Sequence, residues 1–522
     1  MMKRSFWILF LLLAVPCLPL HAQGTSARRH AEKISQALKL IETRYVDTVD
    51  MDRAVDRMLE QLIRELDPHS VYVPAAGVDA LNEPMDGYFE GVGIEYALIA
   101  DTLTVQAVVS GGPAEAVGLH AGDKIVAVDG ETIAGVGVTV DGVRSRLRGP
   151  KGSKVTVSVL RRNALQDFTI RRDKIPMESV EAAYEPEPGT FYLKISRFSK
   201  GTIDEVIEAF SRHATRRPER IILDLRGNGG GFINVAVALA DLFLEKGQLI
   251  VRTEGRDFTK EDRATGHGVF PREPLVVLVD ENSASASEIL AGALQDWDRA
   301  VIVGRRTFGK GLVQQQYVLD DGSAIRLTVA RYHTPSGRVV QSPYEPGQRD
   351  AYFHGIRDRY DRGESFSLDS IQLPDSLKFK TLRLGRTVYG GGGILPDVFV
   401  PYDTTGVTRF TLKVIGSGLL TEYVNNYVDL HRDTLTVPDL AAFDAVYAGL
   451  EADAYAGLLA YCASKGVSPA DDAEASASSA LLRPRLKALL ARSSLGTAGY
   501  WQIINREADQ EFRRALEMVS AR

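Results

Sequence analysis

Lys310 lies in the stretch GRRTFGKG, where Gly304, Gly309 and Lys310 have the spacing of a phosphate-binding loop. In such a loop a Ser or Thr follows the lysine and binds magnesium, and a helix then begins whose N-terminus holds the phosphates. Here residue 311 is Gly, and the LVQQQYVL that follows has the composition of a strand. The sequence therefore argues against a nucleotide at this lysine, and its amine must have another use.

A serine-rich turn precedes this lysine in the stretch VDENSASASEILAGAL, residues 279–294. A buried strand here runs into small residues and then into a helix, which exposes a side chain at the turn beside unpaired N–H groups. A nucleophilic serine needs both features, access to the substrate and amides that stabilise an oxyanion. It also needs a base, because a serine hydroxyl is inert near neutral pH.

The base is either a histidine or a neutral lysine. His213, His267 and His333 lie in or near this part of the chain, but none has the sequence context of a triad. Lysine can replace histidine when its pKa falls from about 10.4 to about 7–8, which requires about 4 kcal/mol of desolvation or like-charge repulsion. Phe308 and Leu312 flank Lys310 without a carboxylate between them, which suits an uncharged amine, although a surface lysine after a turn remains the alternative.

Composition sets the class of protein. The 522 residues are 44% hydrophobic and 25% charged, as in a folded chain of several units. The net charge of −6 and the lack of a long basic block argue against nucleic acid as a partner. The sequence has no H-E-x-x-H or C-x-x-C spacing, so we expect no metal and no cofactor.

The first 22 residues have the layout of a secretory signal peptide, with two basic residues, an apolar run and Leu-His-Ala before Gln23. A membrane anchor is the alternative, but Pro16 and Pro19 interrupt the run. We therefore expect an exported, periplasmic or envelope-associated protein. After cleavage only Cys462 remains, which excludes an internal disulfide.

The pattern along the chain predicts a multidomain α/β protein. Residues 67–70, DPHS, are expected to form a turn, in which His69 and Ser70 are turn residues and not a catalytic pair. DDAEASASSA, residues 471–480, reads as a small-residue linker. The expected units are a signal peptide (1–22), a helical N-terminal region (23–87), a β domain (88–173), an α/β core (174–403, with a polar, solvated excursion at 342–380) and a helical C-terminal region (404–522).

The β domain resembles a PDZ domain of the kind found in bacterial proteases. The resemblance rests on GGPAEAVGLHAGDKIVAVDGETI and RLRGPKGSKVTVSVLR, although an unspecialised β-barrel would contain the same turn glycines. It implies that a peptide adds a strand to the sheet edge, and that a loop formed by Gly91, Val92, Gly93 and Ile94 takes its terminal carboxylate.

The stretch SASASEILAGALQDWDRAVIVGRRTFGKGLVQ resembles the carboxyl-terminal processing peptidases, or tail-specific proteases, which are serine proteases with a PDZ domain and a Ser-Lys pair. The resemblance implies a crotonase-like α/β protease core, Ser285 as nucleophile and Lys310 as general base. It also implies that Gln314 orients the amine, and that Asp296 belongs to the catalytic set or supports it structurally.

The resemblance also extends to the oxyanion hole. The family's glycine turn is matched by LDLRGNGGGF, so the N–H of Gly230 would join that of Ala286, although the family's Pro is replaced here by Gly229. HTPSGRVVQ and GGGILPD complete the shared motifs, whereas 342–380 is long for the family and 404–522 lies outside the pattern.

We therefore expect an exported serine endopeptidase that recognises C-terminal tails or unfolded segments through its PDZ-like domain. Helices at either end of the chain could join copies into a homo-oligomer. Two alternatives remain: a non-catalytic peptide-binding scaffold, and a serine hydrolase of esters or small amides that uses His333 or His267 as base.

Overall fold

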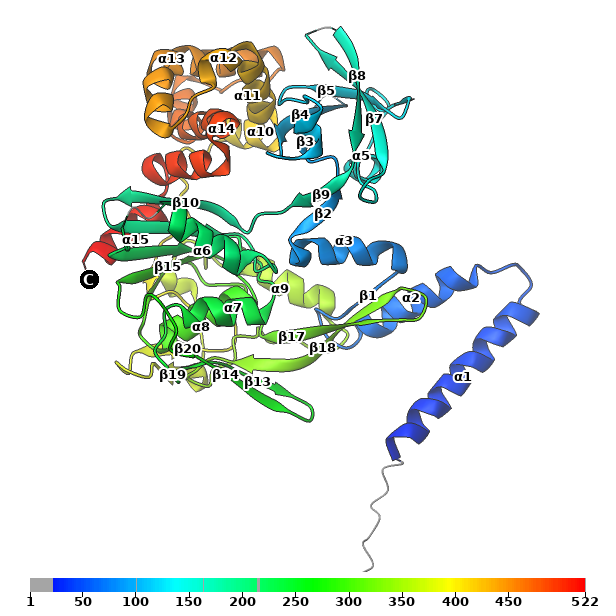
Figure 1. The fold of residues 1–522 in the computed structure, drawn as a ribbon. Coiled ribbons are helices and arrows are strands. Elements are labelled where there is room, and N and C mark those ends of the chain that lie inside the picture. The colour runs from blue at the N-terminus through cyan, green and yellow to red at the C-terminus, as the bar shows by residue number, and fades with distance from the viewer. Residues whose placement is uncertain (1–21, 100, 163, 214–215, 522) are drawn as a thin grey trace, which may run out of the picture.

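The computed structural model describes residues 22–99, 101–162, 164–213 and 216–521. The expected leader, residues 1–22, lies outside these ranges except for Ala22, where the first helix begins. The N-terminal region consists of α1 (Ala22–Arg44), α2 (Met51–Arg64), β1 (Val71–Val73) and α3 (Ala75–Asp86). Helix α1 extends away from the rest of the molecule (Figure 1). In the part of the chain that the structure describes, no helix has the length and apolar character needed to cross a bilayer.

The N-terminal region, expected to be helical, also contributes strand β1 to the core. Its sequence Val-Tyr-Val has high strand propensity, and it pairs antiparallel with β18 (Ala324–His333), with Val71 opposite Arg326. This pairing brings the preceding 67–70 turn against the core, where the backbone N–H of Thr328 donates to Ser70 Oγ at 2.9 Å.

The PDZ-like domain is a small sheet that closes around its own apolar core. Alternate residues of its longest strands, such as Val155, Val157 and Val159, are buried in that core. A two-stranded ribbon, β2 with β9, leads into and out of the domain. Its elements are β2 (Tyr88–Gly91), β3 (Ile94–Ile99), β4 (Thr102–Val108), α4 (Pro113–Ala116), β5 (Lys124–Val128), β6 (Glu131–Thr132), α5 (Val140–Leu147), β7 (Lys154–Arg161), β8 (Ala164–Arg171) and β9 (Asp173–Pro176).

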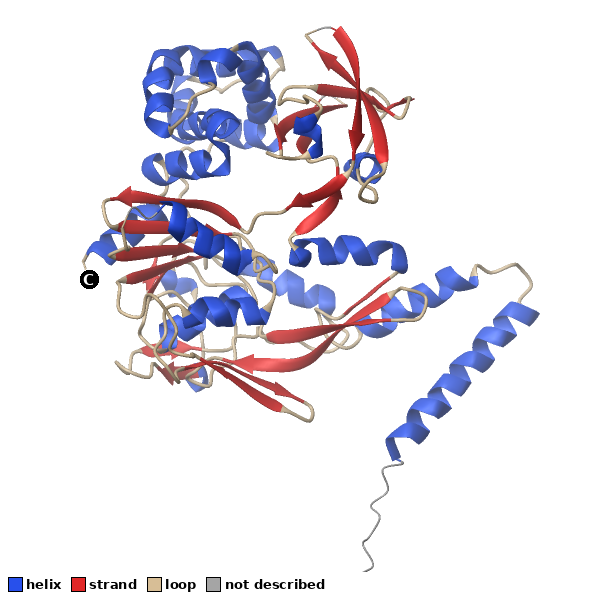
Figure 2. Cartoon of the chain, viewed as in Figure 1, coloured by secondary structure: helices blue, strands red, loops and turns tan. Residues whose placement is uncertain are grey.

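The protease-like core is built on a six-stranded sheet with helices on both faces (Figure 2). All neighbouring strands are parallel except β10 and β11. The strand order is β10 (Val180–Glu187), β11 (Thr190–Ile195), β12 (Arg220–Asp224), β15 (Leu275–Val279), β16 (Val301–Gly304) and β21 (Val398–Phe399). β15, Leu-Val-Val-Leu-Val, is buried at every position, as expected for a strand covered on both faces.

Alternate residues of these strands enter two different cores. Ile221 and Leu223 of β12 pack in the core formed with three helices, α6 (Thr202–His213), α7 (Ile233–Asp241) and α8 (Ala286–Asp296). Ile222, between them, faces the opposite side and packs with Phe512 of the C-terminal helix α15 (Gln510–Ser520).

A second sheet lies beside the first and carries the segment after Lys310. Its path is β1, β18, β13 (Leu249–Gly255) and β14 (Thr259–Arg263), and β17 (Leu312–Val318) also pairs with β18. The expected strand after Lys310 is thus present as β17. A separate ribbon joins β19 (Lys378–Lys380) to β20 (Thr387–Tyr389).

The 342–380 excursion is not simply solvated, contrary to expectation. It contains helix α9 (Arg349–Asp361) and two short 3₁₀ helices (Leu368–Ser370 and Asp375–Leu377). Tyr352 and Glu364 are buried. The polar composition suggested a solvated segment, but several of its charged side chains pair with one another and with the core instead of facing water.

The C-terminal region forms a helical domain with its own apolar core. Residues 471–480, expected to be a linker, instead begin a long helix, because Asp471 caps it by accepting from the N–H of Glu474 at 2.8 Å. The helices are α10 (Arg409–Gly416), α11 (Leu419–Leu430), α12 (Arg432–Leu435), α13 (Leu440–Ser464), α14 (Asp472–Glu507) and α15.

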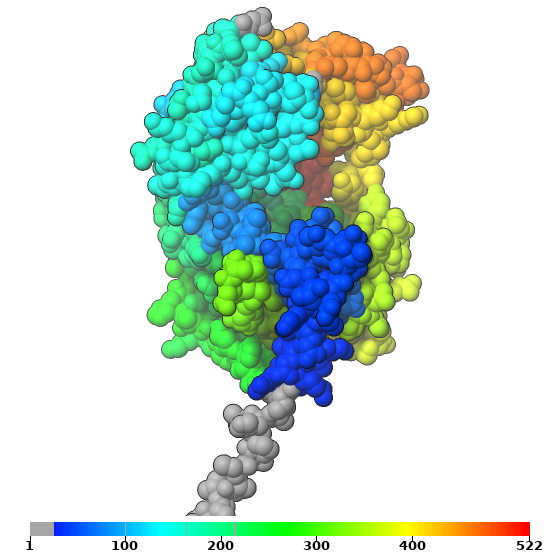
Figure 3. Space-filling view, turned by 90° about the vertical axis from the view of Figure 1, so that its right-hand side faces the viewer, coloured from blue at the N-terminus to red at the C-terminus, as the bar shows by residue number. Residues whose placement is uncertain are grey.

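This helical domain contacts both other units. Figure 3 shows it (yellow to orange) beside the PDZ-like domain (cyan) at one end of the molecule. Arg492 pairs with Glu95 of the PDZ-like domain at 2.5 Å, and Arg432 donates to the Ala121 carbonyl. Since α15 packs on the core sheet, the C-terminal domain links the PDZ-like domain to the core.

Candidate active site

Ser285 occupies a strained turn between β15 and α8. Its backbone has φ 56° and ψ −114°, a conformation that non-glycine residues rarely adopt. Such strain persists only where the surroundings enforce it, and a sharp strand-to-helix turn of this kind presents a nucleophile in other hydrolases. The side chain is half-buried at the first turn of the helix.

The glycine turn after β12 holds this serine turn in place. The Asn228 carbonyl accepts from the N–H of Ala284 at 3.0 Å and from Ser287 Oγ at 2.8 Å. Ser283 Oγ donates to the Leu225 carbonyl at 2.8 Å. Ser283 and Ser287 thus stabilise the turn, since both hydroxyls donate to main-chain carbonyls.

One buried carboxylate, that of Glu288, joins two segments: the serine turn, residues 280–285, and the lysine loop, residues 305–311, which carries Lys310. Its Oε2 accepts from the N–H groups of Ser285 and Lys310, both at 2.9 Å. Its Oε1 accepts from Thr307 Oγ1 at 2.6 Å and from the N–H of Gly309 at 2.8 Å. Burial raises the pKa of Glu288 to about 7, although all four donors favour the ionised form.

A buried hydroxyl joins the same two segments from their carbonyl side. Tyr332 Oη lies 2.7 Å from the Lys310 carbonyl oxygen and 3.1 Å from that of Ser285, so its single proton is shared between them. Glu288 and Tyr332 together fix the backbones of Ser285 and Lys310 relative to each other. The sequence alone did not identify Glu288 or Tyr332 as part of the site.

The Lys310 amine is in a setting that favours its neutral form. Burial lowers the pKa of Lys310, and the nearby Arg326 guanidinium lowers it further. No carboxylate flanks Lys310 in the sequence, but Glu288 and Asp67 from other segments lie close enough to oppose this shift. No hydrogen bond joins Lys310 Nζ to Ser285 Oγ among the described residues.

The two other predicted catalytic residues lie elsewhere. Gln314 Nε2 donates to Thr328 Oγ1 at 3.4 Å and is not bonded to the amine in this structure. Asp296 ends α8, the helix that Ser285 begins, and pairs with the buried Arg338 at 2.7 Å. At about 1.5 Å per helical residue, Asp296 lies about 16 Å along the helix from the serine, too far for the two side chains to touch in this structure.

Of the two predicted oxyanion donors, the N–H of Gly230 is occupied and, in the part of the chain that the structure describes, that of Ala286 is free. Gly230 has φ 101°, and a Cβ there would lie 2.8 Å from Ser285 Cβ, so only glycine fits against the nucleophile. Its N–H, however, donates to Asn228 Oδ1 at 2.8 Å, so in this arrangement it does not serve as the predicted oxyanion donor. The N–H of Ala286 has no acceptor among the described residues and lies 3.0 Å from the position of that Cβ.

His69, which the sequence assigned to a turn, lies close enough to Lys310 to feel its charge. His69 Nε2 lies 3.3 Å from Tyr352 Oη, and its ring is 6.4 Å from that of Phe308. Burial, then the Lys310 charge, lower the pKa of His69 to about 4. Asp67 does form the expected turn, accepting from the N–H groups of His69 and Ser70. His333 instead pairs with Glu254 at 3.2 Å.

The C-terminal helix contacts the segments on both sides of the site. Arg226, two residues before Asn228, donates to Asp509 at 3.0 Å and to Glu511 at 2.8 Å. Arg305, which opens the segment leading to Lys310, also pairs with Glu511. Helix α15 therefore holds the starts of the glycine turn and of the lysine loop.

The predicted peptide loop lies beside a groove in the PDZ-like domain. Val92, Gly93 and Ile94 line a cavity of about 240 Å³ together with Phe89, Tyr96, Arg144, Leu147 and Arg148. β3 pairs only with β4 among the described strands, so its other edge is open to an added strand. Arg144 and Arg148, from the end of α5, bring two guanidinium groups to this groove, where Arg144 pairs with Asp141 at 3.1 Å and Arg148 with Glu83.

Comparison with known proteins identifies the families of the α/β core and of the β domain. Residues 189–346 match the model of peptidase family S41, residues 91–171 that of the PDZ domain, and residues 410–496 a family of unknown function. A carboxy-terminal-processing protease of Bartonella bacilliformis is 36% identical over 310 residues, which are 58% of this chain and 70% of that protein. The chain belongs to peptidase family S41.

Other relatives carry similar names. The carboxy-terminal processing protease CtpB of Bacillus subtilis is 32% identical over 328 residues, 62% of this chain and 68% of that one. Among solved structures, the photosystem II D1 C-terminal processing protease is 27% identical and aligns over 73% of this chain and 88% of that one, with a TM-score of 0.38. The protein is thus an S41 serine-type peptidase with a PDZ domain. Within the described ranges no three His, Cys, Asp or Glu side chains cluster as metal ligands would.

Proposed function

We propose that this S41 peptidase cleaves peptide bonds with Ser285 as nucleophile and Lys310 as general base. Ser285 Oγ attacks the substrate carbonyl carbon while Lys310 Nζ takes the hydroxyl proton. The tetrahedral oxyanion is stabilised by the Ala286 N–H and a second amide of the glycine turn. Lys310 then protonates the leaving amine, and water hydrolyses the acyl-enzyme by the same steps in reverse order.

The observation that carries this proposal is the shared anchoring of the two residues. Glu288 accepts from the N–H of each, and Tyr332 Oη contacts the carbonyl of each. A lysine that merely followed a turn would have no reason to share both contacts with a strained serine. Burial of the amine lowers its pKa, which is the direction that a general base requires.

The arrangement described here is a resting one, in our proposal. The Gly230 N–H is occupied by Asn228 Oδ1, and Lys310 Nζ makes no hydrogen bond to Ser285 Oγ among the described residues. Rotation of the Asn228 side chain would free an amide beside Ala286 and complete the oxyanion hole. Substrate binding would supply the energy for that change.

The test of the dyad is proteolysis of an unfolded polypeptide. We expect Ser285→Ala and Lys310→Ala each to lose at least 1,000-fold in kcat, as removal of triad members does in other serine proteases. Ser211→Ala and Lys246→Ala are matched controls, since both side chains are exposed. Activity that survives in Lys310→Ala would favour a histidine-dependent hydrolase. A wild type as inactive as Ser285→Ala would favour a scaffold.

We further propose that the PDZ domain presents the C-terminal tail of a substrate to this site. The open edge of β3 and the basic end of α5 support a peptide with a free carboxylate. Cleavage of a substrate should slow when its terminal carboxylate is amidated, and a rate unaffected by amidation would contradict presentation.

Export and self-association complete the proposal. Residues 1–22 would direct export, which N-terminal sequencing of the protein from the cell envelope would test: a mature protein beginning at Gln23 supports it. α1 exposes Leu40 and Ile41, and Tyr45 and Val46 follow it exposed. We propose that these apolar residues pack against a second copy of the chain. Light scattering of the full chain should then show a dimer that Leu40→Glu dissociates.

A further inference from the structure

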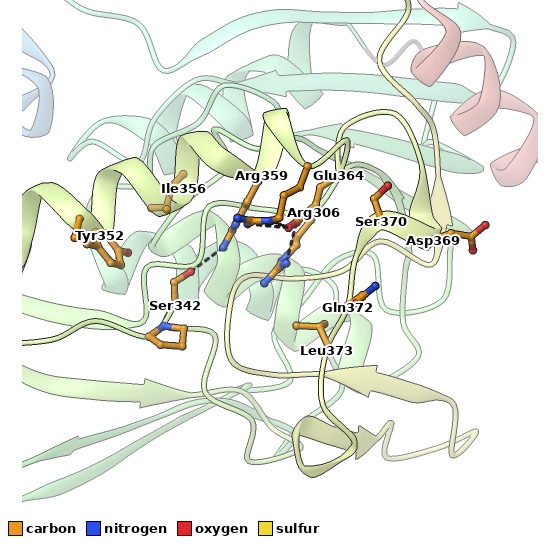
Figure 4. Close-up of a pocket in the computed structure, with 14 residues that line it drawn as sticks. Arg306, Ser342, Tyr352, Ile356, Arg359, Glu364, Asp369, Ser370, Gln372 and Leu373 are labelled. Atoms are coloured by element: carbon orange, nitrogen blue, oxygen red, sulfur yellow. Dashed lines mark hydrogen bonds and ion pairs between the residues drawn. The ribbon is translucent and has the colours of Figure 1, made fainter.

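A cavity outside the PDZ groove and the catalytic turn lies between residues 342–373 and the loop that carries Lys310. It has a volume of about 820 Å³. Figure 4 shows its lining side chains, with Tyr352 at one side and Asp369 at the other. Helix α9 supplies one wall, and this helix lies outside the residues matched by the family S41 model. One wall of the cavity thus lies outside the part of the chain that the family model covers, and Arg306, Ser342 and Pro343 of its lining lie inside it.

The cavity holds more positive than negative charge. Arg306 and Glu364 pair at 2.9 Å, with 11% and 8% of their side chains exposed. Arg362, on the rim, pairs with the same carboxylate at 3.1 Å. Glu364 is thus shared between two guanidinium groups.

Arg359 has no carboxylate partner among the described residues. Its guanidinium donates to Ser342 Oγ at 2.8 Å (Figure 4). It also donates to the carbonyls of Thr307 and Gly392. Burial and the neighbouring Arg306 lower the pKa of Arg359 to about 10. Arg359 is a half-buried cation whose hydrogen-bond acceptors are all neutral, and the nearby Glu364 and Glu288 carboxylates offset only part of its desolvation. An anion that binds directly to the guanidinium would compensate the rest.

Size and lining favour an organic anion over an inorganic one. The volume falls in the range of small-molecule sites, well above that of a single ion. Part of the wall is apolar, formed by Pro343, Ala351, Ile356 and Leu373. A guanidinium group binds a carboxylate through two parallel hydrogen bonds, and the apolar wall suits an adjoining aliphatic side chain.

We propose that this cavity binds the terminal carboxylate of a peptide, with Arg359 as its principal partner. It is a second carboxylate site, separate from the PDZ groove, and goes beyond the proposed function. Its occupancy acts on the lysine loop, because Arg359 holds the Thr307 carbonyl and Ser342 donates its N–H to the Gly309 carbonyl at 2.8 Å.

Hydrogen–deuterium exchange of the full chain carrying Ser285→Ala tests this site, because it localises binding and requires no cleavage. The probes are an acetylated tetrapeptide ending in leucine, its C-terminal amide, and inorganic phosphate. At ten times its dissociation constant, the free acid should slow exchange in 343–373 about tenfold. Protection at 91–94 reports the PDZ groove separately, so failure here leaves the proposed function untouched.

Two variants and one control make the outcome decisive. Arg359→Gln and Ile356→Glu should each abolish protection of 343–373, the first by removing the cation and the second by placing a carboxylate in the wall. Arg357→Gln, on the exposed side of the same helix, should leave it unchanged. Protection by the amide equal to that by the acid, protection by phosphate alone, or protection that persists in both variants would each overturn the proposal.

Discussion

Replacing Glu288 with Gln removes the charge that joins nucleophile and base while keeping the shape of the side chain. The carboxylate accepts two hydrogen bonds at each oxygen. An amide keeps one oxygen and turns an NH₂ group toward two donors, so two hydrogen bonds are lost whichever way it is oriented. Hydrogen bonds to a charged group contribute about 1.5–3 kcal/mol each, so the local loss is about 3–6 kcal/mol.

The Gln variant also gains folding stability by removing a buried charge, and this gain depends on pH. Burial raises the pKa of Glu288 from 4.5 to about 7, so holding it ionised in the folded state costs about 3 kcal/mol. Because the folded pKa is the higher one, the stability that this group contributes is present below pH 4.5 and is lost as the pH rises past 7. Gln does not titrate. The free energy of unfolding of the Gln variant should therefore improve relative to wild type by about 2.5 kcal/mol between pH 5 and pH 8.

The assays are urea unfolding at those two pH values and peptidase kinetics at pH 8. We expect kcat/KM to fall about 100-fold or more, since displacement of reacting groups by about 1 Å has such an effect. Glu261→Gln, an exposed carboxylate on β14, is the control. Wild-type kcat/KM in Glu288→Gln, or a stability difference that does not change with pH, would refute the role assigned to this carboxylate.

Three other changes have expected outcomes. Tyr332→Phe leaves the carbonyls of Ser285 and Lys310 without their donor. The free energy of unfolding should therefore drop by about 1–3 kcal/mol, and kcat should fall. An unchanged kcat would show that the hydroxyl does not position the dyad. Glu511→Gln weakens the ion pairs that join α15 to Arg226 and Arg305. The free energy of unfolding in urea should fall by about 3 kcal/mol, and peptidase activity should fall with it. Full activity would show that this helix does not position the catalytic loops. Gly93→Val strains a backbone with φ 80° in the peptide loop, so KM for tailed substrates should rise with little change in kcat; an unchanged KM would exclude this loop from binding.

The sequence predicted those parts of the site that rest on local pattern. A buried strand, small residues and a helix predict an exposed serine at residue 285, and the structure has that strained turn there. Glu288 also carried a local signal, because Ser285 and Glu288 have the S-x-x-E spacing of a helix-capping box. The same kind of signal, Asp471 three residues before Glu474, indicated a helix start where a linker was expected.

The rest of the site depends on contacts between distant segments, which one sequence does not reveal. Tyr332 reaches Ser285 across 47 positions, and Thr328 donates to Ser70 across 258. His69 therefore looked like a turn residue although it lies beside the lysine loop. The 342–380 segment was misjudged for a related reason: Glu364 and Arg306 are polar by type but buried by pairing with each other.

The claim on which the mechanism depends is that Lys310 acts as a neutral amine, and aminoethylation of Lys310→Cys tests it most directly. The product carries a sulfur in place of one methylene, which lowers the intrinsic pKa of the amine while keeping its reach. In a chain that begins at Gln23, a Cys462→Ala background leaves the introduced cysteine as the single reactive thiol. If Lys310 is the base, activity returns on alkylation and the acid limb of the kcat/KM profile moves to lower pH. Rescued activity with an acid limb at the wild-type pH, or full activity before alkylation, would contradict the account.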